Sequence, residues 1–205
     1  MPSISLDHSS LFIRQLSLEN QNDAYQLKVE YLDDGPFEEF MAMYNKYSEL
    51  FVGLFNAEEL IGISFGWPLA EQFPEEKDEI SLQGIVVRHD FAAQGLGSKL
   101  LAFWEEQVAK RSERFIGVGS APGYVERFYL KHGYKPIQYL LYGNDLALAE
   151  SLSAKGYEIV RTRMVEDTMF VNVKTDRYAP DVRNALCKEF DADEVIYIFQ
   201  KKLPL

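Results

Sequence analysis

Two glycines lie between an apolar run and a helical pattern in the segment GIVVRHDFAAQGLGSKLLAFWEE, residues 84–106. Gly95 and Gly97 can adopt backbone angles that are closed to other residues, and they let another group approach the chain closely. Placed just before a helix, they would expose the N–H groups of its first turn, where the helix dipole attracts anions. The segment therefore predicts a site for an anion such as a pyrophosphate. A plain tight turn between strand and helix is the alternative.

Other well-known phosphate-binding loops do not fit this segment. A Walker loop would end in Gly-Lys-Ser or Gly-Lys-Thr, and that ending is missing. A Rossmann loop needs a third glycine and a position after the first strand, and neither is present. The three histidines are scattered along the chain, so the sequence predicts no metal site.

The elements around this loop are predicted from apolar periodicity and from Gly and Pro residues. Strands are expected at 11–18, 50–55, 60–69, 80–87, 114–120, 134–142, 157–164, 168–174 and 194–202. Helices are expected in 21–49, where residues 33–36 divide two of them, from Gly97 onward, and at 123–134, 145–155 and 180–190. This mixture, with a β-α-β middle, predicts an α/β or α+β protein built on a mixed sheet.

The bulk composition indicates a folded chain without a nucleic-acid partner. The 205 residues are 47% hydrophobic and carry a formal net charge of −11. This charge argues against nucleic acid or an anionic membrane, while it is compatible with a cationic small molecule or with ordinary solubility. No apolar run approaches the roughly eighteen residues of a membrane span. Without a secretory signal pattern, and with Cys187 as the one cysteine, a cytoplasmic location is expected.

The glycine segment resembles motif A of the GCN5-related N-acetyltransferase (GNAT) family. In that motif a strand ends in Val-x-Pro, and an aromatic residue and Gln/Arg-x-x-Gly-x-Gly/Ala follow. The matching residues are Val87, Phe91, Gly95 and Gly97. Two positions depart from the motif, because His89 stands where Pro is common and Ala92 where Gln or Arg is usual. Since such a loop binds mostly through backbone N–H groups, we expect Ala92 to weaken cofactor binding rather than abolish it.

A second segment, VERFYLKHGYKP, resembles motif B of the same family. The matching residues are Phe128, Tyr129, Gly133 and Tyr134. Val125 replaces a common Ala, and Pro122 replaces a common Asn that often helps to hold the cofactor. The resemblance follows the element order over residues 11–142 and is specific over 84–136.

The resemblance implies a GNAT-like fold, with acetyl-CoA as donor and the primary amine of a small molecule as acceptor. The pyrophosphate would lie over the N–H groups of four residues, with Ser98 nearby. These four are Gln94, Gly95, Leu96 and Gly97. The pantetheine arm would pair with the strand edge at Ile85, Val86 and Val87 and would enter between strands 80–87 and 114–120. A backbone N–H near Ile85 or Val86 would stabilise the charge that develops on the thioester oxygen.

The resemblance makes Tyr129 the general acid that protonates the departing thiolate. Val125, Phe128 and His132 share its helical face, so a simple core role is the alternative. The general base is less well defined, because Gln83 occupies the strand position where many relatives carry Glu. Glu79 is the nearest carboxylate, and a water-relayed base is the other arrangement.

The acceptor pocket is expected from the first helices and from the loop at 70–79. The acidic residues in these segments include Glu30, Asp33, Asp34, Glu38, Glu39, Glu71, Glu75 and Glu76. If several of them line the pocket, the acceptor is cationic, such as a polyamine, an aminoglycoside or a lysine side chain. A solvated acidic face is the alternative.

The sequence predicts a GNAT-like core at 1–142 and a C-terminal α+β extension at 143–205. The last strand either closes the core sheet after an inserted helix-hairpin-helix, or belongs to an appendage that covers the acceptor site or forms a homodimer. Two functions other than acetyl transfer stay open. One is a non-catalytic acetyl-CoA-binding sensor or interaction module, and the other is transfer of a longer acyl group.

Overall fold

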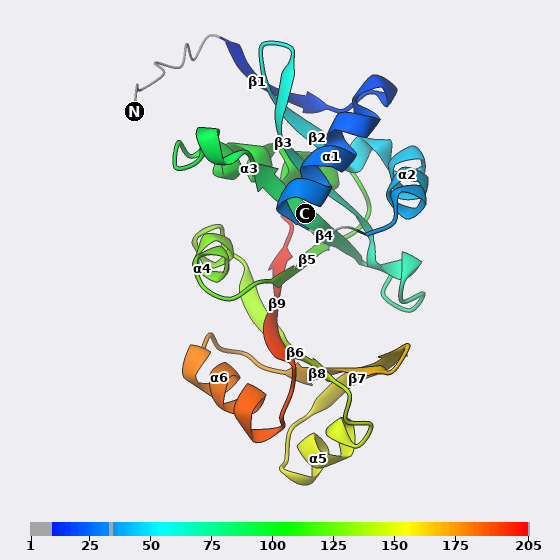
Figure 1. Ribbon diagram of the computed structural model, residues 1–205, viewed down its shortest axis with the longest axis vertical. Helices are drawn as coiled ribbons and strands as arrows, with labels where there is room; N and C mark the ends of the chain where they lie inside the picture. Colours follow the sequence, from blue (N-terminus) through cyan, green and yellow to red (C-terminus); the bar gives the residue numbers. More distant parts are fainter. Residues whose placement is uncertain (1–9, 33–34, 205) are drawn as a thin grey trace. The chain divides into compact units, whose positions relative to one another are not determined.

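The computed structural model describes residues 10–32 and 35–204, which divide into two compact units (Figure 1). The first unit extends to Phe115 and includes the C-terminal residues from Leu203. The second comprises Ile116–Lys202. None of the helices in the described ranges is long and apolar enough to cross a membrane.

The first unit is an antiparallel sheet with helices on both faces. Its strands, in spatial order, are β1 (Leu11–Gln15), β2 (Phe51–Asn56), β3 (Glu59–Pro68) and β4 (Glu79–Val87). Its helices are α1 (Gln21–Tyr31), α2 (Phe37–Lys46) and α3 (Leu96–Val108). Helices α1 and α2 pack on the face that carries Phe65. Gly66, the next residue, faces α3, where a Cβ would come within 2.8 Å of the Trp104 ring.

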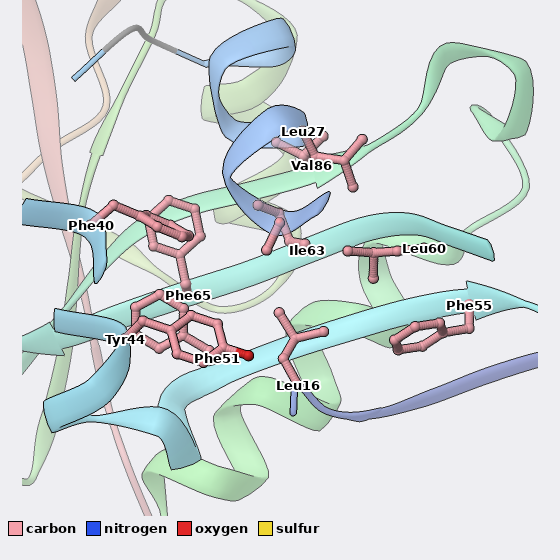
Figure 2. Close-up of a cluster of buried hydrophobic side chains, with 11 residues drawn as sticks. Leu16, Leu27, Phe40, Tyr44, Phe51, Phe55, Leu60, Ile63, Phe65 and Val86 are labelled. Atoms are coloured by element: carbon pink, nitrogen blue, oxygen red, sulfur yellow. The ribbon is translucent and has the colours of Figure 1, made fainter. Parts of the chain in front are cut away.

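One cluster of buried side chains joins α1 and α2 to the sheet (Figure 2). Leu27 of α1 and Phe40 of α2 lie over strand residues that include Ile63, Phe65 and Phe51. The Phe40 ring meets those of Phe51 and Phe65 edge-on, at centroid distances of 5.5 and 5.4 Å. Burial of each such side chain contributes about 1.5–3 kcal/mol, so this cluster fixes both helices on the sheet.

The second unit is built on a sheet in which the last strand of the chain is internal. Its strands, in spatial order, are β5 (Phe115–Ser120), β9 (Glu194–Lys202), β6 (Lys135–Gly143), β8 (Thr168–Lys174) and β7 (Ile159–Val165). Its helices are α4 (Tyr124–Lys131), α5 (Leu148–Ala154) and α6 (Pro180–Glu189). The segment from α5 to α6 lies between β6 and β9 in the chain. The division at 142–143 into core and extension stays a prediction.

The mixed α/β class is confirmed, and the predicted helices and strands are present with small differences at their ends. The first strand ends at Gln15 rather than at residue 18. A short turn begins there, because the backbone N–H and the hydroxyl of Ser17 both donate to Asn20 Oδ1, at 3.1 and 2.9 Å. The fifth helix begins at Leu148, three residues after the predicted start at Asp145.

Candidate functional site

The glycine loop between β4 and α3 is held at both ends and exposed in the middle. Phe91 and Leu96 are buried, with 6% and 3% of their surface exposed. Residues 92–95 between them are exposed. The two apolar side chains therefore anchor the loop, and its backbone remains accessible to a ligand.

The loop backbone presents N–H groups at the start of a long helix. Gly95 is the N-cap of the 13-residue α3 and adopts φ +73°, and an added Cβ there would have open space around it. Ala93 also adopts a left-handed conformation, at φ +60°. The first helical hydrogen bond runs from the Lys99 N–H to the Gly95 carbonyl at 3.2 Å. The N–H groups from Gly95 to Ser98 thus have no intrahelical acceptor, as is usual in the first turn, and can bind an anion.

The end of β4 that precedes this loop presents alternate residues to two faces. Val86 belongs to the buried cluster under α1, while Ile85 and Val87 are half-buried on the other face. All three pair with β3, opposite residues 62–64. The predicted pairing of these residues with a pantetheine arm stays a prediction.

A bulge in β4 changes the direction of Gln83. Phe65 of β3 lies opposite Gly84, and Gly66 lies opposite Leu82, so Gln83 has no partner on β3. A bulge residue of this kind bends the strand and re-aims its side chain. Gln83 consequently lies on the same face as Phe65, and the two line one cavity.

This cavity lies between α1, α2, β3 and β4 and has a volume of about 130 Å³. It is lined by Lys28, Gly35, Pro36, Glu39, Phe40, Phe65, Trp67 and Gln83. Sites for drug-sized ligands commonly have volumes of about 300–1,000 Å³. The cavity therefore has room for a small group, roughly the size of a benzene ring.

A row of polar side chains follows β4 away from the cavity. The Gln83 amide donates to Ser81 Oγ at 2.8 Å, and Ser81 lies opposite the cavity residue Trp67. Strand alternation places Glu79 on the same face, and Glu79 is 8% exposed. Since Glu79 precedes Ile85 by six residues, about 20 Å of strand separates them at roughly 3.3 Å per residue.

Tyr129 lies in the last turn of α4, in the second unit. Gly133 adopts φ +83° and ends the helix, as predicted. The Tyr129 side chain is 3% exposed and packs against the rings of Phe128 and Phe199. Burial, and then the neighbouring Tyr124, raises the pKa of the Tyr129 phenol above its usual value of 10.0. The phenol therefore stays protonated at neutral pH, which a proton donor requires.

The acidic residues expected around the acceptor are dispersed. Within the described ranges, Glu39 is the member of that set that lines the 130 Å³ cavity. Glu30 lines a separate open groove of about 710 Å³ between α1 and the end of β4. Hydrogen bonds, first from Lys46 and then from Tyr47, lower the pKa of Glu71 and hold it at the surface. Asp33 and Asp34 lie outside the described residues.

The family model of the acetyltransferase (GNAT) domain matches residues 17–148. This chain belongs to the GNAT acetyltransferase family. The match includes the glycine loop, the cavity and Tyr129, and it ends in the first turn of α5. Among the residues that the structure describes, no group of His, Cys, Asp and Glu is arranged to hold a metal ion.

Solved structures of acetyltransferases share the fold. Rv2747 from Mycobacterium tuberculosis, solved with CoA and NLQ, is 12% identical, with a TM-score of 0.54 over 94% of this chain and 99% of that one. The acetyltransferase EctA from Paenibacillus lautus, solved with diaminobutyric acid and CoA, is 12% identical, with a TM-score of 0.52 over 82% and 98%. YncA from Salmonella typhimurium, solved with acetyl-CoA, is 12% identical, with a TM-score of 0.51 over 84% and 98%. At these identities the likeness shows the fold alone. No curated protein matches the sequence.

Three buried charged residues of this GNAT protein, Lys28, Glu126 and Arg183, were missed by the sequence analysis. Lys28 is 7% exposed and lines the cavity, and Glu126 of α4 is 1% exposed. Lys28 had a signal, because it lies four residues after the buried Ala24 on the apolar side of α1. Glu126 had none, since its partners come from a distant part of the chain.

We expect Gly95→Trp to abolish CoA binding, because an indole would fill the open space over the loop. The wild-type melting temperature should rise by about 5–10 °C at a hundredfold excess of ligand over its dissociation constant. Gly156→Trp is the matched control, since Gly156 also has a positive φ, of +86°, in open surroundings. Both variants carry a similar strain of about 1–2 kcal/mol. An equal CoA-induced shift in both would contradict the loop assignment.

Proposed function

We propose that this protein transfers the acetyl group of acetyl-CoA to the primary amine of a small acceptor by direct attack. The observation that carries the proposal is the exposed first turn of α3, where Gly95 leaves open space over N–H groups that lack intrahelical acceptors. A pyrophosphate fits this place because it is anionic and rich in acceptor oxygens. Family membership supports acetyl-CoA as the donor.

The proposed reaction needs one proton donor and one proton acceptor. The amine nitrogen attacks the thioester carbonyl, a C–N bond forms, and the C–S bond breaks. A backbone N–H near Ile85 or Val86 would stabilise the oxyanion. Tyr129 gives its proton to the leaving thiolate. Because burial raises the pKa of this phenol, the transfer is less favourable than ordinary pKa values of about 10 and 8.5 suggest, and it requires close contact with the sulfur.

The acceptor ammonium must lose a proton before it attacks, since its pKa is near 10. Gln83, the bulge residue on the cavity face, cannot accept that proton. Glu79 lies too far along β4 for direct contact with an amine near Ile85. We therefore assign proton removal to a water relay past the Ser81 hydroxyl, with the Glu79 carboxylate on the same strand face as the final acceptor.

The cavity limits the size of the acceptor. Its aromatic walls, Phe40, Phe65 and Trp67, favour a small apolar group next to the amine. Lys28 and Glu39 contribute one charge of each sign, so the lining supplies little net attraction for a polyamine. We propose a small monoamine, or the tip of a larger amine, as the acceptor.

A test of the proposed function is turnover of acetyl-CoA with propylamine, 2-phenylethylamine and spermidine. We expect thiol release with the small monoamines and a higher KM for spermidine, because the cavity volume is about 130 Å³. Binding of acetyl-CoA without turnover of any amine would favour the sensor function. Faster turnover of a longer acyl-CoA would change the assigned donor.

We expect Tyr129→Phe to lower kcat by about 10²-fold, with acetyl-CoA affinity unchanged, because the substitution removes only the hydroxyl that donates the proton. Tyr44→Phe is the control, since Tyr44 is equally buried but bonds to the Ser17 carbonyl in the first unit. The raised pKa of Tyr129 also predicts a pH effect. The acid is active below its pKa, so kcat of the wild type should not fall through ionisation of Tyr129 up to about pH 10. An unchanged kcat in Tyr129→Phe would remove this residue from the mechanism.

We expect Gln83→Glu to raise kcat/KM at pH 7 by about tenfold, since a carboxylate of pKa near 4.3 would accept the amine proton in the cavity. Gln138→Glu is the matched control, because Gln138 also bonds to a neighbouring polar side chain, Asn172, but lies in the second unit. Rates measured from pH 6 to 9 give the comparison. A rate equal to or below that of the wild type would show that the proton leaves by another route.

A further inference from the structure

Glu126 is a buried carboxylate in the first turn of α4 with two side-chain partners. Its Oε1 accepts a hydrogen bond from Arg183 Nη1, and its Oε2 accepts one from the Tyr178 hydroxyl at 2.6 Å. The Glu126 side chain is 1% exposed and that of Arg183 is 10% exposed. A buried ion pair that fills both carboxylate oxygens is directional, so it holds α4 in one orientation.

Both partners come from the segment that precedes the last strand. Arg183 lies in α6 and Tyr178 lies just before it, beyond residues 17–148 that match the family domain. Arg183 is held in turn by Asn184, whose Oδ1 accepts from Nε and Nη2 at 3.2 and 3.0 Å. The N–H of Ala179 donates to the Tyr197 hydroxyl at 2.7 Å, which ties this segment to β9.

The same contacts lead to Tyr129. Glu126 precedes Tyr129 by three residues, so the two lie on one face of α4. A row of aromatic rings runs from Tyr178 through Tyr197 and Phe199 to Tyr129, with successive centroid distances of 5.3, 5.5 and 6.2 Å. The Tyr129 ring is therefore fixed from both sides, through its own helix and through the ring row.

A carboxylate buried at this position costs folding free energy. Burying an ion pair carries a desolvation penalty, and an apolar pair of similar volume often gives equal stability. Attachment of α6 to α4 could thus be achieved without charges. What an apolar pair would lack is directionality about the helix axis, and that rotation decides where the Tyr129 hydroxyl points.

We infer that Arg183 and Tyr178 are positioning residues for Tyr129. They act through Glu126, and they make the segment between β6 and β9 a part of the catalytic apparatus. The inference rests on the proposed function of Tyr129 as general acid. Neither Arg183 nor Tyr178 is proposed to contact acetyl-CoA or the amine.

The test is a double-mutant cycle on kcat with Tyr178→Phe and Tyr129→Phe, using acetyl-CoA and the amine that turns over fastest among the three above. Tyr178→Phe removes one hydroxyl and keeps the ring. We expect it to lower kcat by about three- to tenfold, with unchanged acetyl-CoA affinity, since small misplacements of a catalytic group are costly. In the Tyr129→Phe background the same substitution should have no further effect on kcat, because Tyr178 acts through Tyr129.

Tyr142→Phe is the matched control, since the Tyr142 hydroxyl also donates to a carboxylate, that of Glu194, in the same unit. It should leave kcat unchanged. Arg183→Met tests the stronger contact. If this single variant fails to fold because Glu126 is left buried without its partner, the double variant Glu126→Met/Arg183→Met replaces the ion pair with an uncharged pair. We expect the double variant to melt near the wild-type temperature and still show the lowered kcat.

Two outcomes would overturn the inference. One is an unchanged kcat in Tyr178→Phe, and the other is a loss that multiplies with that of Tyr129→Phe, because a merely structural role would lower both backgrounds alike. If Tyr129→Phe alone leaves kcat unchanged, the proposed function of Tyr129 fails first and the inference fails with it. If Tyr129→Phe lowers kcat and Tyr178→Phe does not, the inference alone fails.

Discussion

A helix leaves the N–H groups of its first turn without internal acceptors, and this protein keeps that turn of α3 at the surface. The loop before it can do so because Phe91 and Leu96 are buried on either side of four exposed residues. Gly95, at φ +73°, turns the chain into the helix and adds no side chain above the N–H groups. The strand that leads into the loop, the cluster under α1 and α2, and the packing of Trp104 under β3 all serve to hold this junction in place.

The lining of the cavity in the first unit depends on an irregularity in the same strand. The bulge between Leu82 and Gly84 turns Gln83 toward Phe65 and places an amide where strict alternation would not. The cavity carboxylate, Glu39, comes from α2, whereas Glu79 of β4 lies two alternations further back on this face.

Charge is used in two ways in this chain. Most of the net charge of −11 belongs to exposed groups, which contribute little to stability individually. Glu126 and Arg183 are different, because both are buried and their side chains form an ion pair. Their pairing connects the helix that carries Tyr129 to a segment outside the matched family domain. The segment that contains Arg183 follows the matched family domain in the sequence, yet it is bonded to the helix that carries Tyr129.

The sequence by itself determined the helices and strands, the glycine loop and the end of α4 at Gly133, because each depends on periodicity or on backbone freedom within a few residues. It also carried the two motifs that identify the family. The place of β9 between β5 and β6, the direction of Gln83, the size of the cavity and the burial of Lys28 and Glu126 were decided by the tertiary structure alone. The physical reason is that these features arise from contacts between residues far apart in the chain. Glu126 and Arg183 are 57 residues apart, so no local pattern predicts that they meet.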